Sequence, residues 1–252
     1  MCFEADSLPP VPVVRGAAVS HEELVLESAD GTRFAAFAAV PDEPTGAGIV
    51  VLPDVRGLYR FYEELALRFG ERGLTAVAID YFGRTAGVGR RDDDFEYTEH
   101  VRQTTPGTIQ ADVRAAVEWL REAGCTSVFT VGFCFGGRYS WLAAADGHDL
   151  AGAVGFYGST TTHPVFAGDG PVQAAPRMEA PILALQAGAD QNITAEHNAE
   201  FDRALTAAGV EHEVVVYDGA PHSFFDRKQD EFRDASDDAW ARVLAFVERF
   251  SR

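Results

Sequence analysis

Short, unbroken apolar runs recur along the chain and alternate with longer stretches of helical periodicity. The strand-like runs are Gly48–Leu52, Thr75–Ile79, Ser127–Phe133, Ala151–Tyr157, Pro181–Gln186 and Glu213–Tyr217. The helical patterns are Tyr59–Arg72, Gly107–Ala123, Gly136–Ala145, Ala195–Ala208 and Glu231–Phe250. Unbroken apolar strands that alternate with helices predict an α/β fold, with a mostly parallel sheet covered by helices on both faces.

The first third of the chain adds three features to this pattern. Glu22–Ser28 and Arg33–Val40 flank an Asp-Gly turn, which predicts an antiparallel hairpin at one edge of the sheet. Residues 1–20 are proline-rich and are expected to form an extended arm. Residues 84–106 are polar and poorly periodic, so they form either a cap or substrate loop or a solvated connection. No repeat or linker divides residues 1–252, and we therefore expect a single domain.

Composition limits the classes of partner. The net charge of −18 disfavours nucleic acid and anionic membranes, because phosphate is repelled, although a small anionic substrate stays possible beside a local arginine. No run approaches the roughly 20 apolar residues of a membrane helix, and the acidic N-terminus does not resemble a signal peptide. Three cysteines without C-x-x-C spacing indicate neither a disulfide framework nor a metal site. A cytoplasmic protein, monomeric or a small homo-oligomer, is expected.

The candidate nucleophile is Cys134. It lies in Gly132-Phe133-Cys134-Phe135-Gly136, where a strand pattern gives way at once to a helical one. This is the layout of a nucleophile elbow with cysteine in place of serine, and the glycines suit its sharp turn. The N-terminus of the new helix favours thiolate over thiol. A buried structural cysteine beside a glycine-rich turn is the alternative, and Cys2 and Cys125 lack such surroundings.

A cysteine nucleophile needs a base and a group that orients the base, in the chain order nucleophile, acid, histidine. Asp190 follows one predicted strand and His222 follows the next, so both are expected at the carboxyl edge of the sheet. Asp190 could instead cap the helix that starts near Thr194. Of the other histidines, His163 is the serious rival for the role of base, since it lies in a Thr-rich loop near the same edge.

An oxyanion formed at an ester carbonyl needs two hydrogen-bond donors. The backbone N–H of Phe135, next to the nucleophile, is one candidate. The second is expected from the loop that follows the strand Gly48–Leu52, and Val55 is the best choice there. Asp54 would then lie close to Cys134.

These motifs resemble the dienelactone hydrolase (carboxymethylenebutenolidase) family. The resemblance includes the cysteine elbow, Asp190, His222-Ser223-Phe224, Asp54-Val55-Arg56-Gly57 and Asp80-Tyr81-Phe82-Gly83-Arg84, and it extends from about residue 20 to the end. It implies an α/β-hydrolase fold, no metal or organic cofactor, and hydrolysis of an enol lactone by a Cys-His-Asp triad. It also implies that an acidic residue, commonly glutamate and here Asp54, interacts with the cysteine.

The resemblance further implies two arginines that bind a substrate carboxylate. The first corresponds to Arg84. The position of the second is occupied by Asp226, which would repel a carboxylate, while Arg227 follows it and could substitute if the loop shifted. The named substrate therefore does not carry over with the triad.

Together these patterns predict a hydrolase of small-molecule esters or lactones that forms a thioester at Cys134. Activated substrates such as enol lactones or aryl esters suit a cysteine nucleophile. A general carboxylesterase or detoxifying hydrolase is the alternative among enzymes, and Asp226 favours it. A non-catalytic ligand-binding protein on the same scaffold is the alternative of another class. A redox-sensing cysteine would need a resolving thiol, and the sequence offers none nearby.

Overall fold

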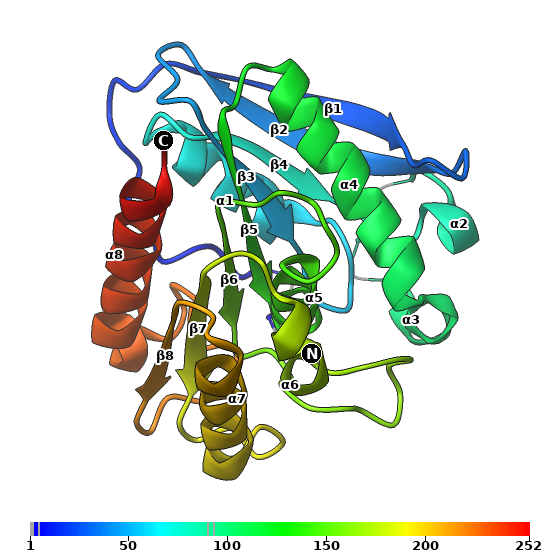
Figure 1. Ribbon diagram of the computed structural model, residues 1–252. Coiled ribbons are helices and arrows are strands. Elements are labelled where there is room, and N and C mark those ends of the chain that lie inside the picture. Colours follow the sequence, from blue (N-terminus) through cyan, green and yellow to red (C-terminus); the bar gives the residue numbers. More distant parts are fainter. Residues whose placement is uncertain (1–2, 5, 90, 93) are drawn as a thin grey trace.

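The computed structural model of the protein describes residues 3–4, 6–89, 91–92 and 94–252, so that Cys2 lies outside the described residues. Eight strands form one twisted sheet in the order β1-β2-β4-β3-β5-β6-β7-β8 (Figure 1). The strands are β1 (Val19–Glu27), β2 (Arg33–Pro41), β3 (Ala47–Leu52), β4 (Thr75–Ile79), β5 (Ser127–Phe133), β6 (Gly152–Phe156), β7 (Ile182–Ala187) and β8 (His212–Tyr217).

The directions of the strands follow the sequence pattern. β1 and β2 form an antiparallel hairpin, and β2 pairs antiparallel with β4. All pairs from β4 through β3 to β8 are parallel. β3, β4, β5, β6 and β7 are buried along their whole length, whereas residues of β1 alternate between half-buried and exposed. The mostly parallel sheet and its antiparallel edge pair are thus confirmed.

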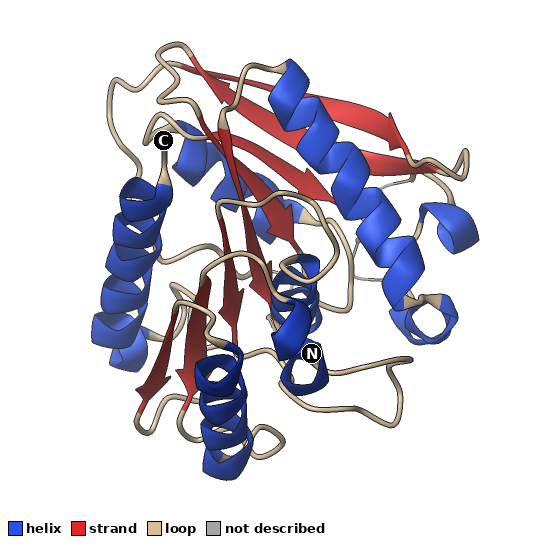
Figure 2. Cartoon of the chain, viewed as in Figure 1, coloured by secondary structure: helices blue, strands red, loops and turns tan. Residues whose placement is uncertain are grey.

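Helices cover both faces of the sheet (Figures 1 and 2). α1 and α8 pack on one face, while α4, α5 and α7 pack on the other, and each face has its own apolar cluster. The helices are α1 (Arg60–Gly70), α2 (Gly83–Ala86), α3 (Tyr97–Gln103), α4 (Pro106–Glu122), α5 (Phe135–Ala143), α6 (Pro171–Ala174), α7 (Ala195–Ala208) and α8 (Arg233–Phe250). Two 3₁₀ turns, Ala175–Arg177 and Asp230–Phe232, precede β7 and α8 respectively.

Two expectations about the first half of the chain need adjustment. β1 begins at Val19, so the irregular arm is shorter than residues 1–20. The segment 84–106 contains the short helices α2 and α3. In α3 only Val101 is buried. A single buried apolar residue does not produce the repeating apolar pattern by which a helix is recognised in a sequence. Among the helices of the described chain, none is long and apolar enough to cross a membrane.

Candidate active site

Cys134 lies at the tip of a sharp turn between β5 and α5. Its backbone has φ 55° and ψ −110°, a strained conformation for a residue with a side chain, and its N–H donates to Phe156 O at 2.9 Å. A Cβ on Gly132 would lie 2.0 Å from Gly136 O, and one on Gly136 would lie 2.1 Å from Leu52 O. Only glycine fits at both positions, and the turn therefore has the geometry of a nucleophile elbow.

Asp190 and His222 meet beyond the carboxyl ends of β7 and β8. His222 Nδ1 lies 2.5 Å from Asp190 Oδ2. The other carboxylate oxygen of Asp190 accepts the N–H groups of Asn192 at 2.8 Å and Ile193 at 3.1 Å. The carboxylate is 1% exposed, so its orientation is fixed by three donors rather than by solvent. It is not the cap of α7, because the Thr194 side chain caps that helix.

The imidazole of His222 lies between Asp190 and Cys134. Burial alone would lower the pKa of His222, but hydrogen bonds to Asp190 and Cys134 and the charges of both outweigh burial and raise the pKa to about 10. Burial raises the pKa of Asp190, yet the bonds from His222 and Asn192 hold that pKa below its usual value. The position of the imidazole between Asp190 and Cys134 thus favours its protonated form.

The rival residues have different surroundings. His163 faces the same cleft, but its ring stacks on Phe166 with centroids 4.3 Å apart, and its Nδ1 accepts the N–H of Val165. Burial and the charge of Arg138 lower the pKa of His163, so it is neutral at pH 7. Cys125 is 7% exposed, and burial raises the pKa of its thiol. Of the candidates that the structure describes, His222 is therefore the histidine that Asp190 orients.

The loop after β3 supplies the second candidate donor for an oxyanion. Asp54 N–H donates to Tyr62 Oη at 2.9 Å, and Arg56 N–H donates to Asp54 Oδ1 at 2.9 Å. Both neighbouring amides are thus engaged, and Val55 itself lines the cleft, as Phe135 does. The side chain of Asp54 is fully buried and accepts from Arg56 at 3.2 Å and from Tyr59 at 2.9 Å. Asp54 is thus a buried carboxylate that binds Arg56 and Tyr59 in the loop after β3.

A cleft of about 480 Å³ opens above the thiol. Its walls are mainly apolar or aromatic, and it is lined by Val55, Cys134, Phe135, Tyr157, Ser159, His163, Phe166, Asn192, Ile193 and His222. None of these residues belongs to the described part of the segment 84–106. The loop between β6 and α6, residues 157–170, supplies part of the wall.

A buried arginine holds that loop. Arg138, in the first turn of α5, is 0% exposed. Its guanidinium donates to the carbonyl oxygens of Ser159 at 3.4 Å and Asp169 at 2.9 Å, and to that of Thr161. It also lies 5.9 Å from the ring of Phe166. Five N–H groups in one planar fork can bind several carbonyls at once, and the loop is therefore fixed to the elbow helix.

Comparison with known proteins identifies the family of the chain. The model of the dienelactone hydrolase family matches residues 34–251. The chain belongs to the dienelactone hydrolase family. It is 29% identical over 221 residues to a Yersinia pestis protein provisionally named a carboxymethylenebutenolidase, covering 85% of this chain and 83% of that one. It is 27% identical over 267 residues to the carboxymethylenebutenolidase of Rhodococcus opacus, covering 99% and 97% respectively.

A solved structure supports the same assignment. A Klebsiella pneumoniae protein, provisionally named a dienelactone hydrolase, superposes with a TM-score of 0.81 at 27% identity and covers 92% of this chain and 99% of its own. The α/β-hydrolase fold expected from the motifs is thus confirmed. As a member of the dienelactone hydrolase family, the chain is a hydrolase of the ester or lactone type.

The two arginines expected to bind a substrate carboxylate are not brought to this cleft. Arg84 forms an ion pair with the buried carboxylate of Asp112 at 2.7 Å and with Asp30 at 2.9 Å. Arg227 donates its backbone N–H to Leu8 O at 3.0 Å and its guanidinium to Pro9 O at 3.2 Å. Nearby carboxylates and carbonyls compete for both side chains, and neither residue lines the cleft. The described residues of the cleft wall thus include neither of the two expected arginines.

Several cleft residues had no signal in the sequence. Tyr157, Phe166 and Ile193 are apolar or aromatic residues in irregular loops, and such residues are usually taken for core. Tyr157 has φ 36°, an uncommon conformation for a non-glycine residue, and its ring lies 4.9 Å from that of His222. The role of Arg138 depends on carbonyls more than 20 residues away, which no motif encodes.

Proposed function

We propose that the chain hydrolyses neutral, activated esters and enol lactones of small molecules, with Cys134 as nucleophile, His222 as acid and base, and Asp190 as the group that orients His222. The observation that carries the proposal is the position of the His222 imidazole. It bonds the carboxylate of Asp190 on one side and Cys134 on the other. This is the arrangement that activates a thiol for acyl transfer.

In the acylation step, the Cys134 thiolate attacks the carbonyl carbon and a C–S bond forms. The carbonyl oxygen becomes an oxyanion, for which the backbone N–H groups of Val55 and Phe135 are the proposed donors. Collapse of this intermediate breaks the bond to the leaving oxygen, which takes the proton of the His222 imidazolium. An enolate needs little help from that proton, because it is a stable leaving group.

In the second step, water attacks the thioester while neutral His222 takes its proton. The new intermediate expels the thiolate, so that the thiolate–imidazolium pair is restored and the carboxylic acid leaves. Thiolate is a better leaving group than an alkoxide. With an unactivated alkyl ester, the first tetrahedral intermediate therefore expels the thiolate and returns to substrate. With an enol or aryl ester, it expels the leaving group instead and forms the thioester.

The preference for neutral substrates follows from the charges around the cleft. Among the residues that the structure describes, those lining the cleft include no arginine or lysine, and the pKa of His163 is lowered by burial and by Arg138. The chain as a whole carries a net charge of −18. Of the described residues that line the cleft, only His222 could be a cation for a carboxylated substrate, and His222 is already bonded to Asp190 and Cys134.

Steady-state hydrolysis of four substrates tests the proposal: a carboxylated dienelactone, a neutral enol lactone, an aryl acetate and an alkyl acetate. We expect the neutral lactone and the aryl ester to be turned over at least tenfold faster, in kcat/KM, than the other two. Cys134→Ala should reduce the rate by at least a hundredfold without loss of fold. Retention of the wild-type rate in this variant would exclude Cys134 as nucleophile, and preference for the carboxylated substrate would overturn the proposed selectivity.

A further inference from the structure

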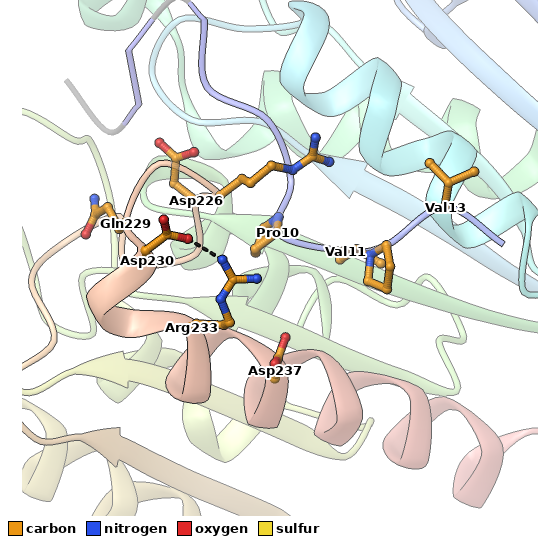
Figure 3. A pocket seen from close by; sticks show the side chains of 10 residues that line it. Pro10, Val11, Val13, Asp226, Gln229, Asp230, Arg233 and Asp237 are labelled. Carbon is orange, nitrogen blue, oxygen red and sulfur yellow. Dashed lines mark hydrogen bonds and ion pairs between the residues drawn. The ribbon is translucent and has the colours of Figure 1, made fainter.

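The arm that precedes β1 lies against the loop that carries His222. Residues 10–13 run beside the segment from Asp226 to the start of α8, and a pocket of about 470 Å³ lies between the two (Figure 3). Pro10, Val11 and Val13 of the arm line one side, while Asp226, Asp230 and Arg233 line the other (Figure 3). The arm and the His222 loop are far apart in sequence but form one surface.

Buried hydrogen bonds join the arm to this loop. Ser7 Oγ donates to Asp226 Oδ2 at 2.6 Å, and the two residues are 1% and 5% exposed. The next residue of the loop, Arg227, binds the carbonyls of Leu8 and Pro9. Asp226 and Arg227 are the positions from which a substrate-binding arginine was expected. In this chain they hold the arm.

The arm also reaches the core beneath the nucleophile. The ring of Phe3 is 3% exposed, stacks on Phe61 at 4.0 Å, and lies 6.5 Å from Phe133, the residue before Cys134. Phe225, from the His222 loop, lies 5.8 Å from the same Phe133 ring. The arm therefore contacts both the support of the nucleophile and the support of the base.

The His222 loop needs such support. It follows the edge strand β8, and Ser223 directly after the histidine has φ 66°, an unfavourable conformation for a non-glycine residue. A strained residue persists only where the surroundings fix it. From α8, Ser236 Oγ donates to Phe224 O at 3.1 Å, and Gln229 donates to Ser223 O at 3.2 Å. Ser7 adds the bond that fixes the far end of the loop.

We propose that the N-terminal arm is a positioning element for His222, and that the Ser7–Asp226 hydrogen bond is the contact through which it acts. The inference rests on the proposed function, since it assigns the arm to the Cys134–His222 pair. Loss of the Ser7 bond removes one donor from the buried carboxylate of Asp226. The donor that remains is the N–H of Lys228, at 3.1 Å. The loop then relaxes, and the imidazole moves away from the thiol.

Ser7→Ala tests the proposal with Ser7→Thr as the conservative variant. We expect kcat to fall roughly tenfold in Ser7→Ala with KM changed less than about twofold, because small displacements of a catalytic group reduce chemistry more than binding. Ser7→Thr, which keeps the hydroxyl, should recover most of kcat. Lys228→Gln is the matched control: it removes exposed ion pairs to Glu4 and Asp6 between the same two segments. Such pairs contribute little, and kcat should stay within about twofold.

A second measurement does not depend on ester turnover. The rate at which iodoacetamide alkylates Cys134 at pH 6, followed in the peptide that contains it, reports the thiolate that the His222 imidazolium stabilises. This rate should fall in Ser7→Ala in proportion to kcat. If Tm falls while kcat and the alkylation rate keep their wild-type values, the arm only stabilises the fold and the proposal is wrong. If wild type hydrolyses no ester, the proposed function fails, and alkylation alone still decides the role of the arm.

Discussion

His222 Nδ1 lies 2.5 Å from a carboxylate oxygen of Asp190 whose partner oxygen is held by two backbone N–H groups. The base is therefore oriented by a group that cannot itself turn. In Asp190→Asn the amide can still accept the two N–H groups, but it has no charge to stabilise an imidazolium. We expect kcat to fall by roughly a hundredfold to ten-thousandfold. Aryl ester hydrolysis and a crystal structure of the variant would check this, and a fall of less than tenfold would contradict the assigned role.

The raised pKa of His222 has a consequence for stability. The folded-state pKa is about 10, against an ordinary value of 6.5. Because the folded protein holds this proton more tightly, the stabilisation is fully present below about pH 6.5 and is lost as pH rises through about 10. The difference in Tm between wild type and His222→Gln should therefore shrink from pH 6 to pH 10. A difference that grows over this range would have the wrong sign for the proposed ion pair.

The elbow should tolerate no side chain at Gly136. A Cβ there would lie 2.1 Å from Leu52 O and 2.3 Å from Pro53 O, both backbone atoms. Gly136→Ala should therefore destabilise the protein by roughly 3 kcal/mol or more, or prevent folding. Gly107→Ala is the control, because its nearest neighbour is 4.0 Å away, on a helix where alanine is favoured. Urea unfolding of both variants tests the contrast, and equal stability would disprove the packing argument.

The wall formed by Phe166 should select for aromatic substrates. Its ring stacks on His163 at 4.3 Å and lies edge-on to Phe135 at 5.2 Å, so a planar group above Cys134 meets three rings. Phe166→Ala should raise KM for aryl esters roughly fivefold or more and leave KM for small alkyl esters nearly unchanged. Val165→Ala removes an exposed neighbour in the same loop and should change neither value. A parallel rise for both ester classes would indicate a collapsed loop instead.

Arg84 should matter for stability and not for substrate charge. Its partner Asp112 is fully buried, and Arg84→Met would leave that carboxylate with Ser28 as its remaining side-chain donor. We expect a loss of about 2–4 kcal/mol in the free energy of unfolding, largely recovered in Arg84→Met/Asp112→Leu. The ratio of rates on carboxylated and neutral lactones should stay within about twofold. A selective loss of activity on the carboxylated lactone would return Arg84 to the substrate site.

The elements that the sequence predicts well are those set by local pattern. β4, β5 and α7 have the predicted bounds or nearly so, because each is an apolar run or a periodic stretch closed by a turn residue. The elbow was recognisable from its local glycine spacing around Cys134, although only Gly132 is required by a contact within the turn, whereas Gly136 is required by the backbone of Leu52 and Pro53. The order Cys134, Asp190, His222 followed from the parallel sheet, which brings the carboxyl ends of its strands to one edge.

Side-chain pairings over long distances were not predictable in this way. Arg84 and Arg227 could each bind a substrate carboxylate. In the fold, however, Arg84 pairs with Asp112, and Arg227 binds a carbonyl of the arm. Nothing near Ser7 in the sequence points to Asp226, which lies 219 residues away. The placement of an ionic or polar group depends on which partners the fold brings closest, and a single sequence does not give that information.

The nucleophile and the base are attached to parts of the sheet that differ in protection. Cys134 follows β5, which has strands on both sides, whereas His222 follows β8, an edge strand with partly exposed residues. Edge strands open at a lower free energy than central ones. Fluctuations of the sheet should therefore separate the imidazole from the thiol while the rest of the molecule stays folded. Heating below the unfolding temperature would then reduce the activity reversibly. Amide hydrogen exchange would rise in β8 at a lower temperature than in β5.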